Sequence, residues 1–408
     1  MTSGEDAPEV PTASVVLKKG RLKPVYAGHP WIFSGAIQNL RGEPDAGDLV
    51  WVLNPSEEVI GWGLYSPSSK LRIRFWGSDT SSEQARFSPQ FRNRIEAAQK
   101  RRISMGLPSD GTTAYRLING EGDRVPGCTV DVVGSALAVR YGSTGLWRRR
   151  AKIANILREI MDCSQIAQIV DPQVALAEEI YGITHISGEP DLEKCPVEFQ
   201  EEGLYFETDL LSAQKSGHYS DQRENRLLVR KLAKGRRVLD LCTYTGGFGL
   251  NAAMGGAESV TAVDSSAPAL KLARRNAAKN GMENISFVHE DIMRVMNGHK
   301  DGSFDLVILD PPKLIKSRNH QGQGEKKYRS LNARALRMLA PEGLFLSFSC
   351  SGVFEQQSFH RMLSLAAQSA EKTLHVHANL GAGPDHPFVV QAPESNYLKG
   401  ILGSVASR

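Results

Sequence analysis

The stretch that decides the fold is VLDLCTYTGGFG, at residues 238–249. Its first five residues form a short and mostly apolar run, which is typical of a strand buried inside a parallel sheet. The next seven residues form a turn that contains three glycines. We therefore predict a buried strand that ends near Cys242 and a helix that begins at the glycines.

Further strand-like segments follow at intervals that leave room for one helix between each pair. They are SVTAVD (259–264), ISFVHED (285–291), FDLVILD (304–310), GLFLSFSC (343–350) and LHVHANL (374–380). Buried strands that alternate with helices specify a parallel sheet covered on both sides. The C-terminal half is therefore predicted to be α/β, with a doubly wound, Rossmann-like sheet.

The sequence before this sheet changes character twice. Residues 1–12 are polar and lack periodicity, which predicts a disordered tail. From 13 to about 85, short strand-like runs alternate with turn residues and predict a small β-barrel. Residues 86–198 mix helical and strand patterns and predict a central α+β domain. The doubly wound domain is then expected to occupy residues 199–408.

The composition is that of an ordinary globular chain, with 41% hydrophobic and 23% charged residues. No run approaches the ~20 apolar residues that a membrane-spanning helix needs, and no signal-peptide pattern precedes the first strand, so a cytoplasmic location is expected. The 5 cysteines form no CxxC pair and no cluster with histidine, so neither disulfides nor a metal are expected.

Basic residues concentrate in three groups in the N-terminal half, although the net charge is only +4. The groups are Lys18, Lys19, Arg21 and Lys23; Arg92, Arg94, Lys100, Arg101 and Arg102; and Arg148, Arg149, Arg150 and Lys152. One such group is usually a solvated face, but three groups in one half weaken that interpretation.

The segment LRIRFW, at residues 71–76, adds an aromatic side chain to this pattern. Strict alternation turns its three apolar residues inward and places Arg72, Arg74 and Trp76 on the outer face of the strand. We predict that this outer face and the first basic group bind RNA.

The ends of the predicted C-terminal strands carry reactive or charged side chains. Ligands of doubly wound sheets bind beyond the carboxyl ends of the strands. In this chain those ends hold Asp240, Asp264, Asp291, Asp310 and Cys350. The pattern predicts one shared site at that edge of the sheet.

The glycine turn and Asp264 indicate a cofactor with an adenosine ribose. Glycines allow close backbone approach to a ligand, and Asp264 follows Asp240 by 24 residues (264 − 240), which suits the ribose hydroxyls. S-adenosylmethionine and the dinucleotides share that ribose, and Gly247, Gly249 and Ala252 also fit the dinucleotide pattern GxGxxA. A plain turn with Asp264 as a helix cap is a third interpretation.

Two features favour a methyltransferase acting on a base. Asp310 is followed by two prolines, and this rigid loop resembles the segment that nucleobase methyltransferases place against the base. Lys313 stands where amine-methylating enzymes typically have an aromatic residue, which points away from an exocyclic nitrogen. A cysteine such as Cys350 can add to carbon 6 of a pyrimidine and so activate carbon 5. Cys163, Cys195 and Cys242 are interpreted as buried filler.

The chain resembles the bacterial 23S ribosomal RNA cytosine-5 methyltransferases that carry an N-terminal PUA domain. The resemblance covers nearly the whole chain and rests on LDLCTYTGGFG, VDSS, LDPPK, FSCSG, QKSGHYSDQRENR (214–226) and NGEGDRVPGCTVD (119–131). GRLKPVYAGHPWIFSGAI (20–37) resembles the opening of that PUA domain, a small RNA-binding barrel.

This resemblance implies a cofactor, a partner and a set of site residues. The cofactor would be S-adenosylmethionine and the partner 23S rRNA, and a homodimer is a possible assembly. Asp310 would contact the base beside Lys313, and Cys350 would be the nucleophile. The cofactor would be held by Asp240, Tyr244, Thr245, Gly246, Gly247, Asp264, Ser265 and Asp291, with Asp221 and Arg223 closing its pocket. Four residues depart from the family pattern, namely Ser216, His218, Ser220 and Cys242.

Two other functions fit parts of the same pattern. Methylation of a different rRNA base, such as guanine at nitrogen 7, would use the glycine turn and the Asp-Pro-Pro loop but would leave Cys350 without a role. A non-catalytic RNA-binding assembly factor would need none of Asp264, Asp310 and Cys350, so the presence of all three argues against it.

Overall fold

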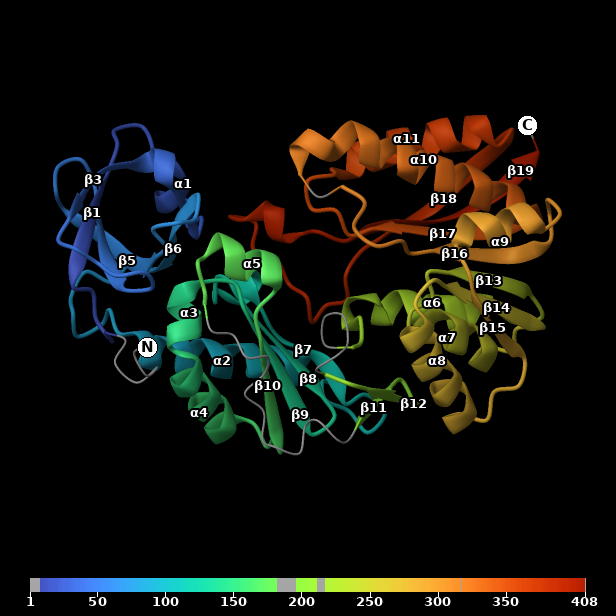
Figure 1. Ribbon diagram of the computed structural model, residues 1–408, viewed down its shortest axis with the longest axis horizontal. Helices are drawn as coiled ribbons and strands as arrows, with labels where there is room; N and C mark the ends of the chain where they lie inside the picture. The colour runs from blue at the N-terminus through green and yellow to red at the C-terminus, as the bar shows by residue number, and fades with distance from the viewer. Residues whose placement is uncertain (1–7, 182–195, 211–216, 316, 408) are drawn as a thin grey trace. The chain divides into compact units, whose positions relative to one another are not determined.

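The computed structural model describes residues 8–181, 196–210, 217–315 and 317–407 (Figure 1). The chain divides into two compact units. Unit 1 comprises residues 1–199, 209–216 and 384–395, and unit 2 comprises residues 200–208, 217–383 and 396–408. Within the described ranges, no helix is both long and apolar enough to cross a membrane.

Unit 1 begins with a curved six-stranded sheet in the order β2-β6-β5-β4-β1-β3. Its interior is filled by apolar residues such as Val15, Val52 and Ile73, each fully buried. The predicted strand-like runs of the small β domain are present as β1, β4, β5 and β6, and the structure adds β2 and β3. Their bounds, with the short helix α1, are β1 (Ala13–Leu17), α1 (Lys23–Tyr26), β2 (Trp31–Phe33), β3 (Ile37–Arg41), β4 (Leu49–Leu53), β5 (Val59–Tyr65) and β6 (Leu71–Gly77).

A four-stranded sheet in the order β10-β9-β8-β7 and its helices follow in unit 1. Helix α2 completely buries Phe91, Ile95, Ala98 and Arg102, whose spacing of four, three and four residues predicts one face of a helix. The elements are α2 (Phe87–Ser104), β7 (Ala114–Asn119), β8 (Cys128–Val133), β9 (Ala136–Tyr141), α3 (Thr144–Arg148), α4 (Arg150–Ile160), β10 (Gln165–Ile169) and α5 (Pro172–Ala177).

The spacing of Trp147, Ala151, Ala154 and Leu157 predicts one helix from Trp147 onward, but the structure has two, α3 and α4. Arg149 separates them with φ −98° and ψ 9°, outside helical geometry. Its guanidinium is buried and donates to the carbonyl oxygens of Gly47 and Gly145. This change of direction also leaves Ala151 exposed, although the single-helix pattern predicted it on the buried face.

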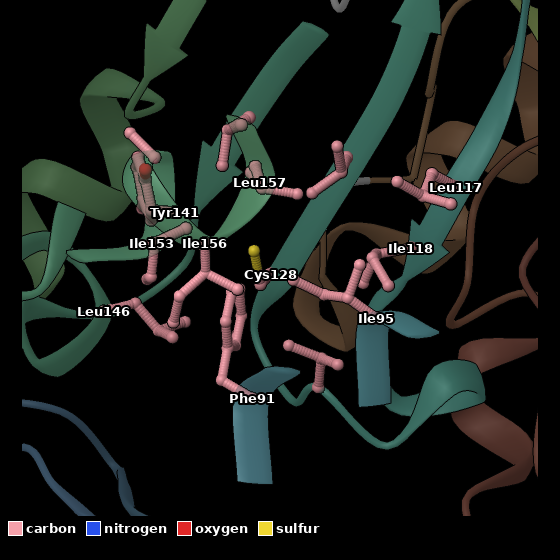
Figure 2. Packing of buried hydrophobic residues seen from close by; sticks show 14 of the residues in the cluster. Phe91, Ile95, Leu117, Ile118, Cys128, Tyr141, Leu146, Ile153, Ile156 and Leu157 are labelled. Atoms are coloured by element: carbon pink, nitrogen blue, oxygen red, sulfur yellow. The ribbon is translucent and has the colours of Figure 1, made fainter. Parts of the chain in front are cut away.

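The small β domain and the central domain share one hydrophobic core. The ring of Trp76 lies 6.2 Å from that of Trp62 and 4.9 Å from that of Phe87, measured between centroids. Figure 2 shows the central part of this core, where the sulfur of Cys128 lies among aliphatic and aromatic side chains from α2, α4 and the sheet. Burial raises the pKa of Cys128 to about 12, so this thiol is an inert packing residue.

The predicted outer face of β6 is not available to RNA. Trp76 is 2% exposed and Arg74 is 7% exposed, and Nη1 of Arg74 pairs with Oε1 of Glu178 at 3.1 Å. The alternation correctly gave the side of the strand on which these residues lie, but the central domain covers that side. The prediction is therefore wrong for Arg74 and Trp76. Arg72 is half-buried and donates to the carbonyl oxygen of Pro67.

The predicted disordered tail is ordered in its described part. Glu9 accepts a hydrogen bond from the backbone N–H of Ser88 at 3.0 Å and pairs with Nζ of Lys152 at 2.7 Å. The carbonyl oxygen of Pro8 accepts a hydrogen bond from Arg149. Residues 8–12 thus fold with unit 1, whereas residues 1–7 lie outside the described residues.

Residues 384–395 also belong to unit 1, although unit 2 segments precede and follow them. Asp385 is fully buried, and its Oδ2 accepts a hydrogen bond from the backbone N–H of Arg116 at 2.9 Å. Its carbonyl oxygen accepts one from Arg102 at 2.8 Å. This late segment therefore completes the polar interior of unit 1.

Unit 2 contains a seven-stranded sheet in the order β15-β14-β13-β16-β17-β19-β18. The predicted fold class is confirmed, with one antiparallel strand, β19, between β17 and β18. The hairpin strands β11 (Val197–Glu201) and β12 (Leu204–Thr208) lead into it. The sheet strands are β13 (Arg237–Leu241), β14 (Ser259–Asp264), β15 (Ile285–His289), β16 (Phe304–Leu309), β17 (Leu339–Ser349), β18 (Lys372–Leu380) and β19 (Lys399–Ser407).

Helices cover both faces of this sheet, as the strand pattern predicts (Figure 1). Along β13, Val238 packs into one core with α6 and α7, while Leu239 and Leu241 pack into the other with α9, α10 and α11. The helices are α6 (Arg223–Leu232), α7 (Gly247–Met254), α8 (Ala267–Lys279), α9 (Ile292–Gly298), α10 (Gln321–Met338) and α11 (Gln356–Ser369).

Strand β19 was not predicted because its sequence begins KGILG and carries two glycines, which are poor strand formers. Both glycines are required by packing. A Cβ on Gly400 would lie 2.4 Å from the ring of Phe348, and one on Gly403 would lie 2.7 Å from the carbonyl oxygen of His375. These close approaches let β19 insert between β17 and β18.

Candidate active site

The glycine turn after β13 is tightly folded. Cys242, Tyr244 and Gly246 have left-handed backbone conformations, with φ of 64°, 53° and 89°. A Cβ on Gly249 would lie 2.9 Å from Cδ1 of Ile285 and 3.2 Å from Oδ2 of Asp240, so only glycine lets α7 begin this close to the strands. The turn therefore presents its backbone at the carboxyl end of the sheet.

Asp240 lies completely buried beneath this turn. Its Oδ2 accepts hydrogen bonds from the N–H of Gly249 at 2.8 Å and from Oγ1 of Thr243 at 2.5 Å. None of the described residues offers a hydrogen bond to its buried Oδ1. Burial raises the pKa of Asp240 to about 6. A buried carboxylate oxygen without a protein donor can accept a hydrogen bond from a ligand. Beside a glycine turn that a ligand can approach closely, it fits a site for a cationic, amine-bearing cofactor.

Asp264 fixes the turn to the end of β14. Its Oδ2 accepts from the N–H of Tyr244 at 2.9 Å, and its Oδ1 accepts from the N–H of Ser266 at 2.8 Å. The cap of α8 is Ser266, whose hydroxyl accepts from the N–H of Ala269, so the interpretation of Asp264 as that cap is wrong. Ser265 is exposed next to Asp264.

Asp291, at the end of the next strand, is the N-cap of α9. Its Oδ1 accepts from the N–H of Met293 at 2.9 Å and from that of Arg294 at 3.3 Å. This carboxylate is exposed and has a structural role that the strand-end argument did not assign to it. Thr245 is buried, and its carbonyl oxygen accepts from Nδ2 of Asn276.

Asp310 is held by an amide chain from the segment before the sheet. Nε2 of Gln222 donates to Oδ2 of Asp310 at 2.9 Å, and Nδ2 of Asn225 donates to Oε1 of Gln222 at 2.6 Å. Gln222 is only 2% exposed, so this orientation is well defined. Asp221 and Arg223, on either side of it, are also buried, and Oδ2 of Asp221 accepts from the hydroxyl of Tyr397.

The phenol of Tyr219 marks where these groups converge. Its ring packs edge-on against that of Tyr244, with centroids 5.2 Å apart. Burial raises the pKa of Tyr219 above its usual value, and Tyr244, Asp310, Asp221 and Cys350 raise it further. The residues that follow β16 and β17, Asp310 and Cys350, thus both influence one side chain that the sequence did not single out.

His218, one of the departures from the family pattern, belongs to a buried ion network. Its Nε2 lies 2.6 Å from Oε2 of Glu201, and Arg226 pairs with the same carboxylate. The Arg226 and His218 charges hold the pKa of Glu201 down at about 2, against the opposing effect of burial. Arg226 also lies beneath the glycine turn, since a Cβ on Gly247 would come within 3.1 Å of its Cδ. Ser216 lies outside the described residues.

Two cysteines follow strands β13 and β17, which lie on either side of β16, and their surroundings differ. Burial raises the pKa of Cys242 well above its usual value, and Asp264, Asp310 and Asp240 raise it further, so it stays a thiol. Cys350 is half-buried at the end of β17, and the neighbouring cation is Lys399.

Two family models match the sequence. One is described as S-adenosylmethionine-dependent methyltransferase and matches residues 179–400; the other is a PUA-like domain and matches residues 15–76. Ribosomal RNA large subunit methyltransferase I of Klebsiella pneumoniae (strain 342) is 33% identical over 395 residues, which cover 95% of this chain and 97% of that protein. The chain belongs to the S-adenosylmethionine-dependent methyltransferases.

Other similar proteins agree with this assignment. The protein of the same name from Pseudoalteromonas translucida (strain TAC 125) is 33% identical over 405 residues, covering 97% of this chain and all of that one. A solved methyltransferase described as complexed with SAH superposes with a TM-score of 0.81 at 21% identity, over 96% of this chain and 99% of that chain. The resemblance seen in the sequence motifs is therefore confirmed, and the cofactor of this methyltransferase is S-adenosylmethionine.

The residues of this methyltransferase that sequence reasoning missed are Tyr219, Gln222 and Lys399. The first two lie inside the quoted segment QKSGHYSDQRENR, so that motif held the signal. Lys399 carried none, because it lies on the unpredicted strand β19. Lys313 is exposed on the loop after β16. Among the described residues, no group of three or more His, Cys, Asp or Glu could hold a metal ion.

Proposed function

We propose that this methyltransferase transfers a methyl group from S-adenosylmethionine to carbon 5 of a cytosine in 23S rRNA. The observation that carries the proposal is the placement of Asp310 and Cys350. They directly follow β16 and β17, which are parallel neighbours with Leu309 opposite Ser347, and both act on the phenol of Tyr219. The relatives named as rRNA large subunit methyltransferases support the choice of substrate.

The cofactor is proposed to lie against the glycine turn. Gly246, Gly247 and the backbone of Tyr244 and Thr245 offer close approach, Asp240 offers a buried carboxylate oxygen, and Asp264 offers a carboxylate beside Ser265 for the ribose. Asp291 would lie near the adenine, and Asp221 and Arg223 would close the pocket. When bound, S-adenosylmethionine supplies an electrophilic methyl group on a sulfonium sulfur.

Cys350 is proposed as the nucleophile. Its thiolate adds to carbon 6 of the cytosine, and the electron pair displaced from the 5,6 double bond makes carbon 5 able to attack a methyl group. After transfer, loss of the carbon 5 proton restores the double bond and releases the sulfur as a thiolate. Cysteine chemistry of this kind needs an accessible, ionisable sulfur, which the half-buried Cys350 offers and the acid-surrounded Cys242 does not.

Asp310 is proposed to hold the base while this addition occurs. A proton shared between its carboxyl group and the ring nitrogen draws off the negative charge that thiolate attack creates. Gln222 fixes the orientation of this carboxyl group through its hydrogen bond to Oδ2 of Asp310. Lys313 follows the two prolines on an exposed loop, where its charge suits an RNA phosphate.

RNA contact by the PUA-like domain is proposed to use the first basic group rather than β6. Lys18, Lys19, Arg21 and Lys23 are all exposed. Two aromatic rings lie in the same part of the fold, since Tyr26 on α1 is 62% exposed and Phe33 at the end of β2 is 50% exposed. Exposed cations beside exposed aromatic rings are the combination that binds single-stranded RNA.

The decisive experiment maps the methylated atom in 23S rRNA treated with the purified protein and S-adenosylmethionine. Cys350→Ala should abolish transfer while S-adenosylhomocysteine still binds, and Cys163→Ala, in unit 1, should retain it. RNA carrying 5-fluorocytosine at the target should form a covalent complex with the wild type and with Cys163→Ala only. Methylation of guanine nitrogen 7 would replace this proposal, and absence of any methylation would favour an assembly factor.

A further inference from the structure

Lys399 occupies an unusual place for a lysine. It begins β19, which runs antiparallel to β17, and its Cα pairs with that of Ser349, the residue before Cys350. It is only 6% exposed. Its ammonium donates to the carbonyl oxygen of Ser351 at 2.9 Å and to that of Tyr397 at 2.8 Å. The ammonium is therefore fixed beside the backbone that carries Cys350.

No carboxylate of the described residues forms an ion pair with this buried ammonium, whose two hydrogen bonds go to neutral carbonyl groups. A buried cation without an opposite charge is costly, and burial accordingly lowers the pKa of Lys399 to about 8. The opposing influence comes from Cys350, whose negative charge raises the pKa of Lys399, while Lys313 lowers it. The anion that suits this site is thus the Cys350 thiolate.

We propose that Lys399 is a positioning residue that keeps Cys350 in its thiolate form, ready to attack the base. The inference rests on the proposed function, in which Cys350 is the nucleophile. Because the interaction is mutual, a thiolate that stabilises the ammonium is stabilised by it to the same extent. The ammonium acts before the addition and again when the sulfur is expelled, and it remains protonated in both steps.

The other titratable groups to be weighed against Lys399 are two phenols, Asp310 and Lys313. Tyr219 lies in the segment before the sheet, and Tyr328 on α10 contacts the hydroxyls of Ser349 and Ser351. Burial raises the pKa of both phenols, so both are neutral near pH 7. Asp310 would oppose thiolate formation, and Lys313 would favour it from an exposed loop. A buried cation has a larger effect than an exposed one because water screens it less.

The inference is tested by the rate at which iodoacetamide alkylates Cys350 in the full chain between pH 5.5 and 9.5, followed by mass spectrometry of the Cys350 peptide. In the wild type the midpoint should lie below the ~8.5 of an ordinary cysteine. Lys399→Met should raise the midpoint by about one unit and slow alkylation at pH 7 about tenfold, as loss of a neighbouring cation does. Lys399→Arg, which keeps the charge, should recover part of the shift.

The same samples contain an internal control, because Cys163 in unit 1 should keep its alkylation profile in all three proteins. A wild-type midpoint at or above 8.5 overturns the inference even if Lys399→Met fails to fold, and so does an unchanged midpoint in a folded Lys399→Met protein. Failure of the proposed function looks different. Cys350→Ala would then methylate RNA normally, while the alkylation profiles would still report whether Lys399 and Cys350 are coupled.

Discussion

Two sets of basic residues in unit 1 look alike in the sequence and differ in the structure. Lys18, Lys19, Arg21 and Lys23 are exposed to solvent. Arg74, by contrast, pairs with Glu178, which is 104 residues away, and the fully buried Arg102 binds both oxygens of Asp123. A run of basic residues in the sequence therefore does not show whether their side chains face solvent. The acidic residue that pairs with a buried arginine can come from a distant element of the chain.

The largest effect is expected when a buried arginine loses its partner. Glu178→Gln leaves the charge of Arg74 buried and unpaired, which should lower the free energy of unfolding by about 3–5 kcal/mol. Urea denaturation measures this, with Glu179→Gln as the matched control, since Glu179 is exposed. RNA affinity of the folded protein should be unchanged. A loss of RNA affinity at full stability would restore β6 as an RNA surface.

Asp240 extends the comparison to a buried charge without an opposite charge. Its folded pKa of about 6 lies above the ~3.9 of the unfolded chain, so its contribution to stability is fully present below about pH 4 and is lost as pH rises through 6. The difference in unfolding free energy between the wild type and Asp240→Asn should therefore fall by roughly 3 kcal/mol between pH 4 and pH 8. Denaturation at several pH values measures it, and the exposed Glu283→Gln should show no such trend.

Cofactor binding should show the opposite pH dependence. The ionised form of Asp240 attracts a cationic cofactor, so affinity for S-adenosylmethionine should weaken as pH falls below about 6. Calorimetry on the wild type checks this, and an affinity that stays flat down to pH 5 would place Asp240 away from the cofactor charge.

Asp291 tests an exposed acid with a structural role. Asp291→Ala removes the cap of α9 and should cost about 1 kcal/mol of stability. Asp171→Ala, which removes the cap of α5 in unit 1, should cost a similar amount. If Asp291 also contacts the cofactor, its variant alone should bind S-adenosylhomocysteine more weakly. Equal affinity of both variants for S-adenosylhomocysteine would mean that Asp291 acts only as a helix cap.

The smallest effect is expected for the exposed lysines. Lys18→Gln and Lys23→Gln should leave stability unchanged and should each reduce the slope of log K for RNA against log salt by about 0.7 per lost phosphate contact. Filter binding at several salt concentrations measures the slope. Lys300→Gln, an exposed lysine of unit 2, serves as the control. Unchanged slopes for Lys18 and Lys23 would move the RNA surface elsewhere.

The sequence predicted what depends on local pattern. Buried strands and glycine turns specified the sheet of unit 2, and because parallel strands end at one edge, they also brought Asp310 and Cys350 together. What it could not predict depends on partners distant along the chain. Trp76 is covered by α2, and Gln222 donates a hydrogen bond to Asp310, which lies 88 residues later. Lys399 lies on an antiparallel strand whose glycines are not typical of strands.

The buried position of Asp385 has a consequence for how the protein is made. The backbone N–H of Arg116 and the side chain of Arg102 bind Asp385, which lies 269 positions after Arg116 and 283 positions after Arg102 in the chain. During vectorial synthesis, unit 1 therefore emerges first yet completes its interior only after nearly all of unit 2 has left the ribosome. A gene fragment that stops at residue 199 encodes the PUA-like and central domains without the segment that completes their polar interior.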